Sequence, residues 1–170
     1  MNKNTEFEKE KLRAIQAVFE ESVKNNTIEN MEAYTDENFS FVSFTDKSFD
    51  NFQSFKQQWK VTRTQMIGNG AFETQLNPNP SLVLGDIAIC HGNAKNSMVD
   101  KKGKSYEFST HWTVVLKCNE GEWKVLRAHN SLDPFANPML KNGIKKALLW
   151  TGLLAFVGGS AVGAAVMAMM

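Results

Sequence analysis

The chain has 170 residues, of which 42% are hydrophobic and 22% are charged, and its formal net charge is +1. This is the composition of an ordinary globular domain, and it excludes long disorder, collagen-like repeats and a disulfide scaffold. Because 18 Asp and Glu residues balance 19 Lys and Arg residues, there is no positive excess to neutralise a phosphate backbone. We therefore expect no nucleic-acid partner.

Helices are predicted first along the chain. Residues 5–24 carry apolar side chains near helical spacing with Glu and Lys between them, which predicts an amphipathic helix. A brief second helix is predicted over 27–34 and a strand over 39–43. Helical spacing then returns over 49–63 and includes Trp59.

Strands separated by turn signals are predicted from residue 66 onward. The expected strands are 86–97, 106–118 and 123–131, and the turn signals lie at 77–80, 100–103 and 119–121. Helices gathered on one face of a curved antiparallel sheet make an α+β fold, and the chain is long enough to bury one core.

The last part of the chain differs from the rest, because residues 147–170 carry no charged side chain. A helix over this run would rise about 36 Å, against a hydrocarbon core of roughly 30 Å. A buried helix of the soluble core is the alternative, but such a helix usually keeps a polar face. We expect one C-terminal transmembrane helix at 147–170, a connector at 134–146 and a soluble domain at 1–133.

Lysines at 141, 145 and 146 precede the predicted span, and no charged side chain follows it. By the positive-inside bias the soluble domain lies in the cytoplasm, and residues 1–13 contain no apolar signal region. A single-pass tail anchor is the simplest topology. In that reducing compartment, Cys90 and Cys118 are expected to be buried thiols rather than a disulfide or a metal site.

A known family is indicated by the predicted closing hairpin. Its parts are a long strand containing His-Trp-Thr-Val-Val-Leu-Lys (111–117), the turn Asn-Glu-Gly-Glu (119–122) and the strand Trp-Lys-Val-Leu-Arg-Ala-His-Asn-Ser (123–131). This hairpin resembles the last hairpin of the SnoaL-like branch of the nuclear transport factor 2 superfamily, which includes ketosteroid isomerase. The resemblance covers about residues 5–133.

The resemblance implies a cone-shaped α+β fold with a pocket between sheet and helices, often dimerised through the sheet. It does not determine function, because one fold hosts many activities. Ketosteroid isomerase uses an Asp base with a Tyr and a protonated Asp, and no such set matches the expected strands of this chain. We therefore expect a homodimer without isomerase chemistry.

Strand parity selects the candidate pocket residues. In 123–131 the odd-numbered side chains share one face, on which Trp123 and Val125 lead to Arg127, His129 and Ser131. We assign this odd face to the interior and leave the even face for a subunit contact. Ser131 is expected to hydrogen-bond the backbone at the strand end rather than act as a nucleophile.

Four residues form the predicted ligand site. We expect Trp59 from the third helix, His111, Arg127 and His129 to converge on one cavity. An apolar helix wall opposite polar strand residues suits an amphipathic ligand whose polar or anionic end lies near Arg127. The histidines lack the spacing of a metal motif, so we expect neither a metal nor a cofactor.

Three functions remain open from the sequence. The first is a non-catalytic, membrane-tethered domain that binds a small amphipathic molecule or a partner protein. The second is an isomerase, hydratase or hydrolase that acts on a hydrophobic substrate through pocket histidines. The third is a structural assembly domain. The lack of a recognisable acid/base pair favours the first or the third.

Overall fold

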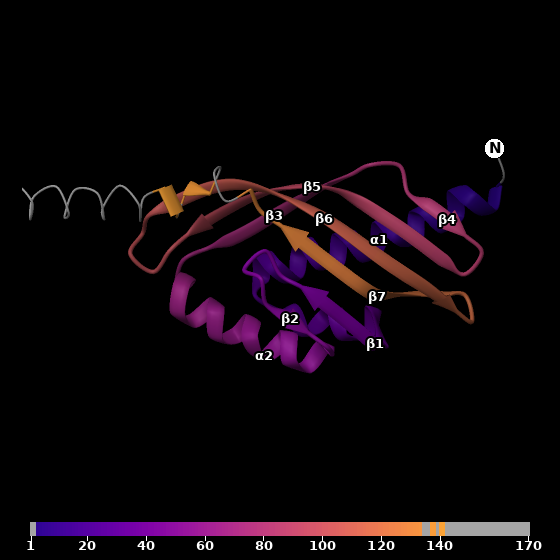
Figure 1. Ribbon diagram of the computed structural model, residues 1–170, viewed down its shortest axis with the longest axis horizontal. Helices are drawn as coiled ribbons and strands as arrows, with labels where there is room; N and C mark the ends of the chain where they lie inside the picture. The colour runs from indigo at the N-terminus through magenta and orange to yellow at the C-terminus, as the bar shows by residue number, and fades with distance from the viewer. Residues whose placement is uncertain (1–2, 134–136, 139, 142–170) are drawn as a thin grey trace, which may run out of the picture. The chain divides into compact units, whose positions relative to one another are not determined.

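The computed structural model of the protein describes residues 3–133, 137–138 and 140–141. Two compact units follow one another along the chain, residues 1–133 and residues 134–170. In the first unit, α-helices alternate along the chain with the strands of one curved sheet (Figure 1). The sheet belongs to this unit.

Local conformation and capping mark the end of α1 and the start of α2. The helical elements are α1 (Lys3–Asn25), the 3₁₀ helix η1 (Ile28–Tyr34), α2 (Phe52–Thr62) and the π-helical turn η2 (Arg63–Ile67). Directly after α1, Asn26 has a φ of 57°, a left-handed conformation that asparagine adopts more readily than most residues. At the start of α2, the side chain of Asn51 accepts a hydrogen bond of 2.8 Å from the Ser54 N–H.

The strands form one sheet. They are β1 (Thr35–Val42), β2 (Ser48–Phe49), β3 (Phe72–Pro78), β4 (Leu82–Leu84), β5 (Ile87–Val99), β6 (Ser105–Asn119) and β7 (Glu122–Ser131). Their order is β2-β1-β7-β6-β5-β3, and β4 pairs with β5. The β1–β7 pair is parallel, whereas the other pairs are antiparallel.

The core lies between one face of the sheet and the helices. In β5 and β6 the even-numbered side chains are mostly buried and the odd-numbered ones mostly exposed, as expected of strands covered on one face. We call the covered face the inner face and the other the outer face. Inner side chains of the strands pack with Ile15 and Val23 of α1 and with Phe52 of α2.

A bulge in β7 reverses its side-chain alternation. Leu116 pairs with Val125, whereas Val115 pairs with Arg127, so Leu126 is an extra residue in the strand. Before the bulge the odd-numbered side chains point inward. After it, the even-numbered ones do.

The predicted α+β class is confirmed, with helices against one face of a curved sheet that is mainly antiparallel. The expected helices and the three long strands lie within a few residues of their predicted positions. Both cysteines are free.

The predicted membrane span at 147–170 lies outside the described residues. Among the residues that the structure describes, no helix is both long and apolar enough to cross a membrane.

Candidate ligand site on the inner face

A continuous series of aromatic rings lines the inner face. Phe44 contacts Phe108 of β6, with ring centroids 6.0 Å apart, and Phe108 stacks on Phe72 of β3 at 6.5 Å. Phe72 lies 6.0 Å from Trp59 of α2, which in turn contacts Phe55 at 6.3 Å. Helical spacing in α2 and alternation in the strands bring these rings to one side, where they form an apolar wall.

Polar side chains interrupt this wall. Thr110 and Asn96 are 1% and 7% exposed, respectively. The Asn96 amide nitrogen donates to the Thr110 hydroxyl oxygen at 3.2 Å and lies 3.4 Å from the Ala94 and Phe108 carbonyl oxygens. The Asn96 amide is therefore held in a fixed orientation.

Two further polar groups are shielded from solvent without a partner. Asn130 Oδ1 and Arg63 Nη1 are buried atoms that make no hydrogen bond in the described part of the chain. Burial also lowers the pKa of the Arg63 guanidinium. An unsatisfied buried donor or acceptor costs about 1–3 kcal/mol, so both atoms would gain from a partner that enters from outside. Ser22 Oγ, in α1, is likewise unpartnered.

These polar groups lie toward the end of the sheet that carries the β5–β6 turn. Asn130 is near the end of β7, and Thr110 and Asn96 follow toward that turn on β6 and β5. The η2 turn, which contains Arg63, is joined to the same end because the Lys101 N–H donates to the Met66 carbonyl at 3.1 Å. The hydroxyl, amide and guanidinium groups thus lie toward one end of the sheet whose inner face carries the aromatic wall, and we treat this region as the candidate site.

Of the four predicted site residues, Trp59 belongs to the inner wall. Its ring contacts Phe55 and Phe72, and its Nε1 donates to Asn26 Oδ1 at 3.3 Å.

The predicted convergence of Trp59 with the other three residues is wrong. His111, Arg127 and His129 are exposed and lie on the outer face. Arg127 and His129 point away from the interior because the bulge at Leu126 reverses the alternation of β7. His111 points outward because the odd-numbered side chains of β6 lie on the outer face. The Arg127 guanidinium donates to the carbonyls of Asn38 and Leu126.

The three histidines share the outer face. His91 pairs with Thr113, and Thr113 pairs with His129, so these side chains form one row across β5, β6 and β7. His111 lies two residues along β6 from Thr113. Among the residues that the structure describes, no group of three or more His, Cys, Asp or Glu side chains could hold a metal ion. Ser131 Oγ lies 3.5 Å from the His111 carbonyl oxygen.

An open depression at the β6–β7 turn is a weaker candidate. Its volume is about 550 Å³, and its lining residues are Cys118, Asn119, Glu120, Glu122 and Lys124. Its Glu122–Lys124 pair is long, at 3.9 Å, and exposed, so this depression offers less to a ligand than the inner face does.

The inner polar residues were missed for identifiable reasons. Thr110 and Asn96 lie in strands whose alternation is regular, so parity could have assigned both to the inner face. Asn130 was assigned to the wrong face because of the bulge. Nothing in the local sequence distinguishes Arg63 from a surface arginine at a helix end.

Comparison with known proteins agrees with this architecture. A family model described as a SnoaL-like domain matches residues 12–135. The chain belongs to this SnoaL-like family. The resemblance of the closing hairpin is therefore confirmed at the level of the family. No curated protein matches the sequence.

Solved structures of similar fold align with most of the chain. A nuclear transport factor 2-like superfamily protein from Salmonella enterica matches with a TM-score of 0.67 and 12% identity, over 75% of this chain and 92% of that one. A conserved protein from Planctomyces limnophilus matches at 0.66 and 12%, over 75% and 98%. A nuclear transport factor 2-like protein of unknown function from Prochlorococcus matches at 0.60 and 18%, over 78% and 94%. The TM-scores show a shared fold, and at these low identities the likeness shows the fold alone.

Proposed function

We propose that this SnoaL-like domain is a non-catalytic, membrane-tethered module that binds a small amphipathic molecule on its inner face. The observation that carries the proposal is the pair of buried, unpartnered polar atoms, Arg63 Nη1 and Asn130 Oδ1, on a domain whose inner wall is aromatic. The tether is the charge-free run at 147–170.

The chemistry of the wall defines the ligand class. The Arg63 N–H that lacks a partner can donate to an oxygen atom of a ligand. A carboxylate is the best acceptor, because a hydrogen bond that involves charged groups contributes about 1.5–3 kcal/mol to binding. The Phe44, Phe72 and Phe108 rings favour an apolar or aromatic body. The anionic end that the sequence placed near Arg127 is thus reassigned to Arg63.

The chemistry of the polar side chains on the inner face favours a binding function over a catalytic one. Amide, hydroxyl and guanidinium groups can fix the position of a ligand's oxygen atoms, but they are poor general acids or bases near neutral pH. His111 and His129, on which the enzyme hypothesis depended, lie on the outer face.

Calorimetric titration of the full chain in lipid nanodiscs tests the proposal, with phenylbutyrate as the probe and phenylbutanol as its uncharged counterpart. We expect saturable binding of phenylbutyrate, and Arg63→Gln should raise its Kd by about 10- to 100-fold through loss of one charged hydrogen bond. Phenylbutanol should bind both proteins equally.

Arg13→Gln is the matched control, because Arg13 is an exposed arginine of α1. If phenylbutyrate does not bind, or if both arginine variants bind it as the wild type does, the inner face is not a site for anionic amphipaths.

A further inference from the structure

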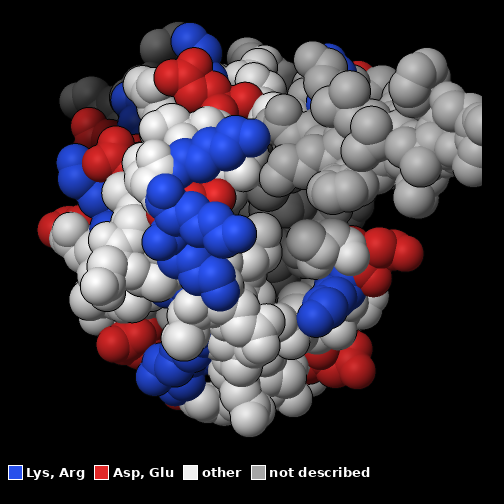
Figure 2. Space-filling view, turned by 90° about the vertical axis from the view of Figure 1, so that its left-hand side faces the viewer, with Lys and Arg blue, Asp and Glu red and all other residues white. Residues whose placement is uncertain are grey.

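The turn between β5 and β6 presents lysines at one end of the domain. Lys101, Lys102 and Lys104 are all exposed. The carboxylate of Asp100 is used within the turn, where it accepts from the N–H groups of Lys102 and Lys104 at 2.8 and 3.0 Å and from the Tyr106 hydroxyl at 3.2 Å. The outward charge of the turn is therefore positive. Figure 2 views the molecule from this end and shows basic side chains gathered on it.

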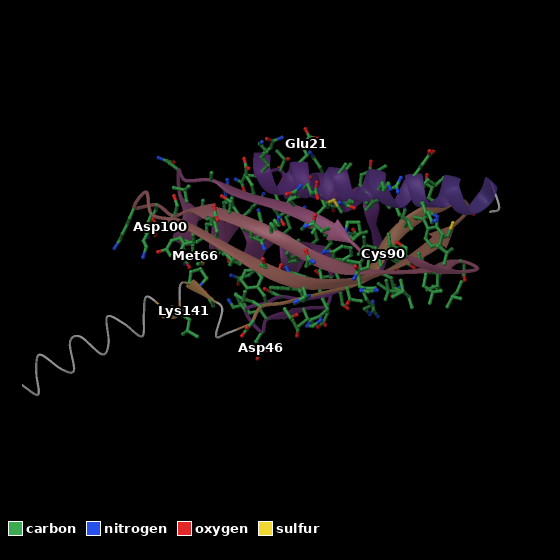
Figure 3. All side chains as sticks on the ribbon, turned by 90° about the horizontal axis from the view of Figure 1, so that it is seen from above. Glu21, Asp46, Met66, Cys90, Asp100 and Lys141 are labelled. Carbon is green, nitrogen blue, oxygen red and sulfur yellow. The ribbon has the colours of Figure 1, made fainter. Side chains whose placement is uncertain are left out.

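An exposed apolar side chain lies beside these lysines. Met66 of η2 is 42% exposed, and its carbonyl accepts a hydrogen bond from the Lys101 N–H at 3.1 Å. Figure 3 shows Met66 and Asp100 at the same end of the domain. We call Met66 with Lys101, Lys102 and Lys104 the turn surface.

We propose that the turn surface rests on the anionic headgroups of the membrane that holds the tail, an inference that depends on the proposed tether. Each Lys near an anionic bilayer surface adds to its attraction, and an apolar side chain among lysines can enter the interface. Lysine stems also lie along apolar surface while their ammonium groups reach the headgroups.

The direction of β7 agrees with a domain orientation in which the turn surface faces the membrane. β7 is antiparallel to β6, so the chain leaves the sheet at Ser131 heading toward the end that carries the turn surface. Ser131 pairs with His111, about 25 Å along β6 from the turn at 3.3 Å per residue. Residues 132–146 include helical positions at 138, 140 and 141, and they can span from about 22 Å if all are helical to about 50 Å if all are extended. This reach is comparable with the distance to the turn, so the turn surface and the predicted span can meet one bilayer.

The test uses the full chain in vesicles of phosphatidylcholine, with or without phosphatidylserine. An environment-sensitive dye is attached at Asn69→Cys in a Cys118→Ser background. Asn69 is exposed and follows Gly68, which lies against Lys101. A second label at Leu84→Cys serves as the distal control, because Leu84 is 57% exposed and lies at the other end of β5. Alkaline extraction reports separately whether the tail is inserted.

We expect the dye at position 69, and not that at position 84, to shift to the blue in phosphatidylserine vesicles and to return in high salt. Neutralising two lysines, Lys101→Gln with Lys102→Gln, should lower the ratio of membrane-contacting to free domain by about 30-fold. Arg13→Gln with Lys95→Gln removes the same charge from other exposed positions and should leave the ratio unchanged.

The outcomes separate this inference from the proposed tether. If alkali does not release the chain but the dye at position 69 shows no phosphatidylserine-dependent shift, the turn surface is overturned and the tether stands. The same conclusion follows if the two double variants lower the ratio of membrane-contacting to free domain equally. A chain that alkali releases, but that floats with phosphatidylserine vesicles only when Lys101 and Lys102 are present, supports the turn surface and overturns the tether. Release by alkali without flotation overturns both.

Discussion

Asp100 organises the β5–β6 turn. The hydrogen bond from the Lys104 N–H, followed by those from the Lys102 N–H and the Tyr106 hydroxyl, lowers the pKa of its carboxyl group. Because these donors interact more strongly with the carboxylate than with the neutral acid, the ionised form holds the turn together. The same interactions leave the lysine charges of the turn unopposed on its outer side.

The lowered pKa of Asp100 predicts an acid-dependent contribution to stability. A carboxyl group with a native pKa below its unfolded value stabilises the fold above the unfolded pKa, and this contribution is lost as pH falls through the native pKa. We expect Asp100→Asn to lower the Tm at neutral pH. When pH is reduced from about 5 to about 3, the Tm of the variant should fall by less than the Tm of the wild type. Thermal unfolding followed by tryptophan fluorescence measures both effects.

Asp46→Asn, in another exposed turn, is the control for general charge effects. Parallel pH profiles for the wild type and Asp100→Asn would show that the Asp100 hydrogen bonds do not stabilise the native state.

Leu126 shows how one residue limits prediction of a site. The alternation in 123–131 correctly placed Trp123 and Val125 inside, because up to that point the strand is regular. The extra residue then reversed the faces of Arg127 and His129. A bulge is set by pairing with β6, so local alternation contains no signal for it.

At the scale of elements, α1 protects an edge of the sheet. β3 is the last strand on its side, and an uncovered edge can pair with another chain. Glu20 Oε1 accepts from the Leu76 N–H at 2.6 Å, and the Gln16 amide donates to the Leu76 carbonyl at 3.1 Å. Side chains of α1 therefore take the place of a neighbouring strand at Leu76.

Removing the Glu20 carboxylate should destabilise this edge. Glu20→Ala leaves the Leu76 N–H without its acceptor, and we expect it to reduce the free energy of unfolding by about 1–2 kcal/mol. Glu20→Gln keeps an oxygen acceptor and should recover much of the loss. Urea denaturation measures the differences.

Glu21→Ala is the matched control, because Glu21 is exposed and its side chain, among the described residues, accepts only from the Asn25 amide at 3.5 Å. If the Glu20 and Glu21 alanine variants lose equal free energy of unfolding, the loss comes from helix charge or helix propensity and not from the contact with the sheet edge.

Local elements were predictable, whereas their long-range pairing was not. Periodicity and turn residues predicted α1, α2 and the β5–β7 series, because each depends on neighbouring residues. The parallel pairing of β1 with β7 joins residues that lie far apart in the sequence, such as Ser40 and Arg127. No periodicity within either strand specifies such a partner.

At the scale of the whole molecule, the SnoaL-like domain has a hydrophobic core of its own. Among the residues that the structure describes, the buried members of this hydrophobic cluster lie between Ile15 and Val125. The outer face of β5, β6 and β7 is exposed, and Thr113 lies at its centre between His91 and His129. This face is the surface through which the predicted homodimer would form.

A chain without residues 142–170 should therefore fold, remain soluble without detergent and dimerise through the outer face. In a two-fold symmetric interface each substitution occurs twice, so Thr113→Lys places two new positive charges within the contact. We expect at least about a tenfold weaker dimer, because like charges brought together at an interface cost several kcal/mol. Gln57→Lys, on exposed α2 surface, adds the same charge elsewhere and should not alter the dimer. Sedimentation velocity over a concentration series measures the equilibrium. A truncated chain that stays monomeric at tens of micromolar, or a Thr113→Lys dimer as strong as the wild type, would remove the outer face from the assembly.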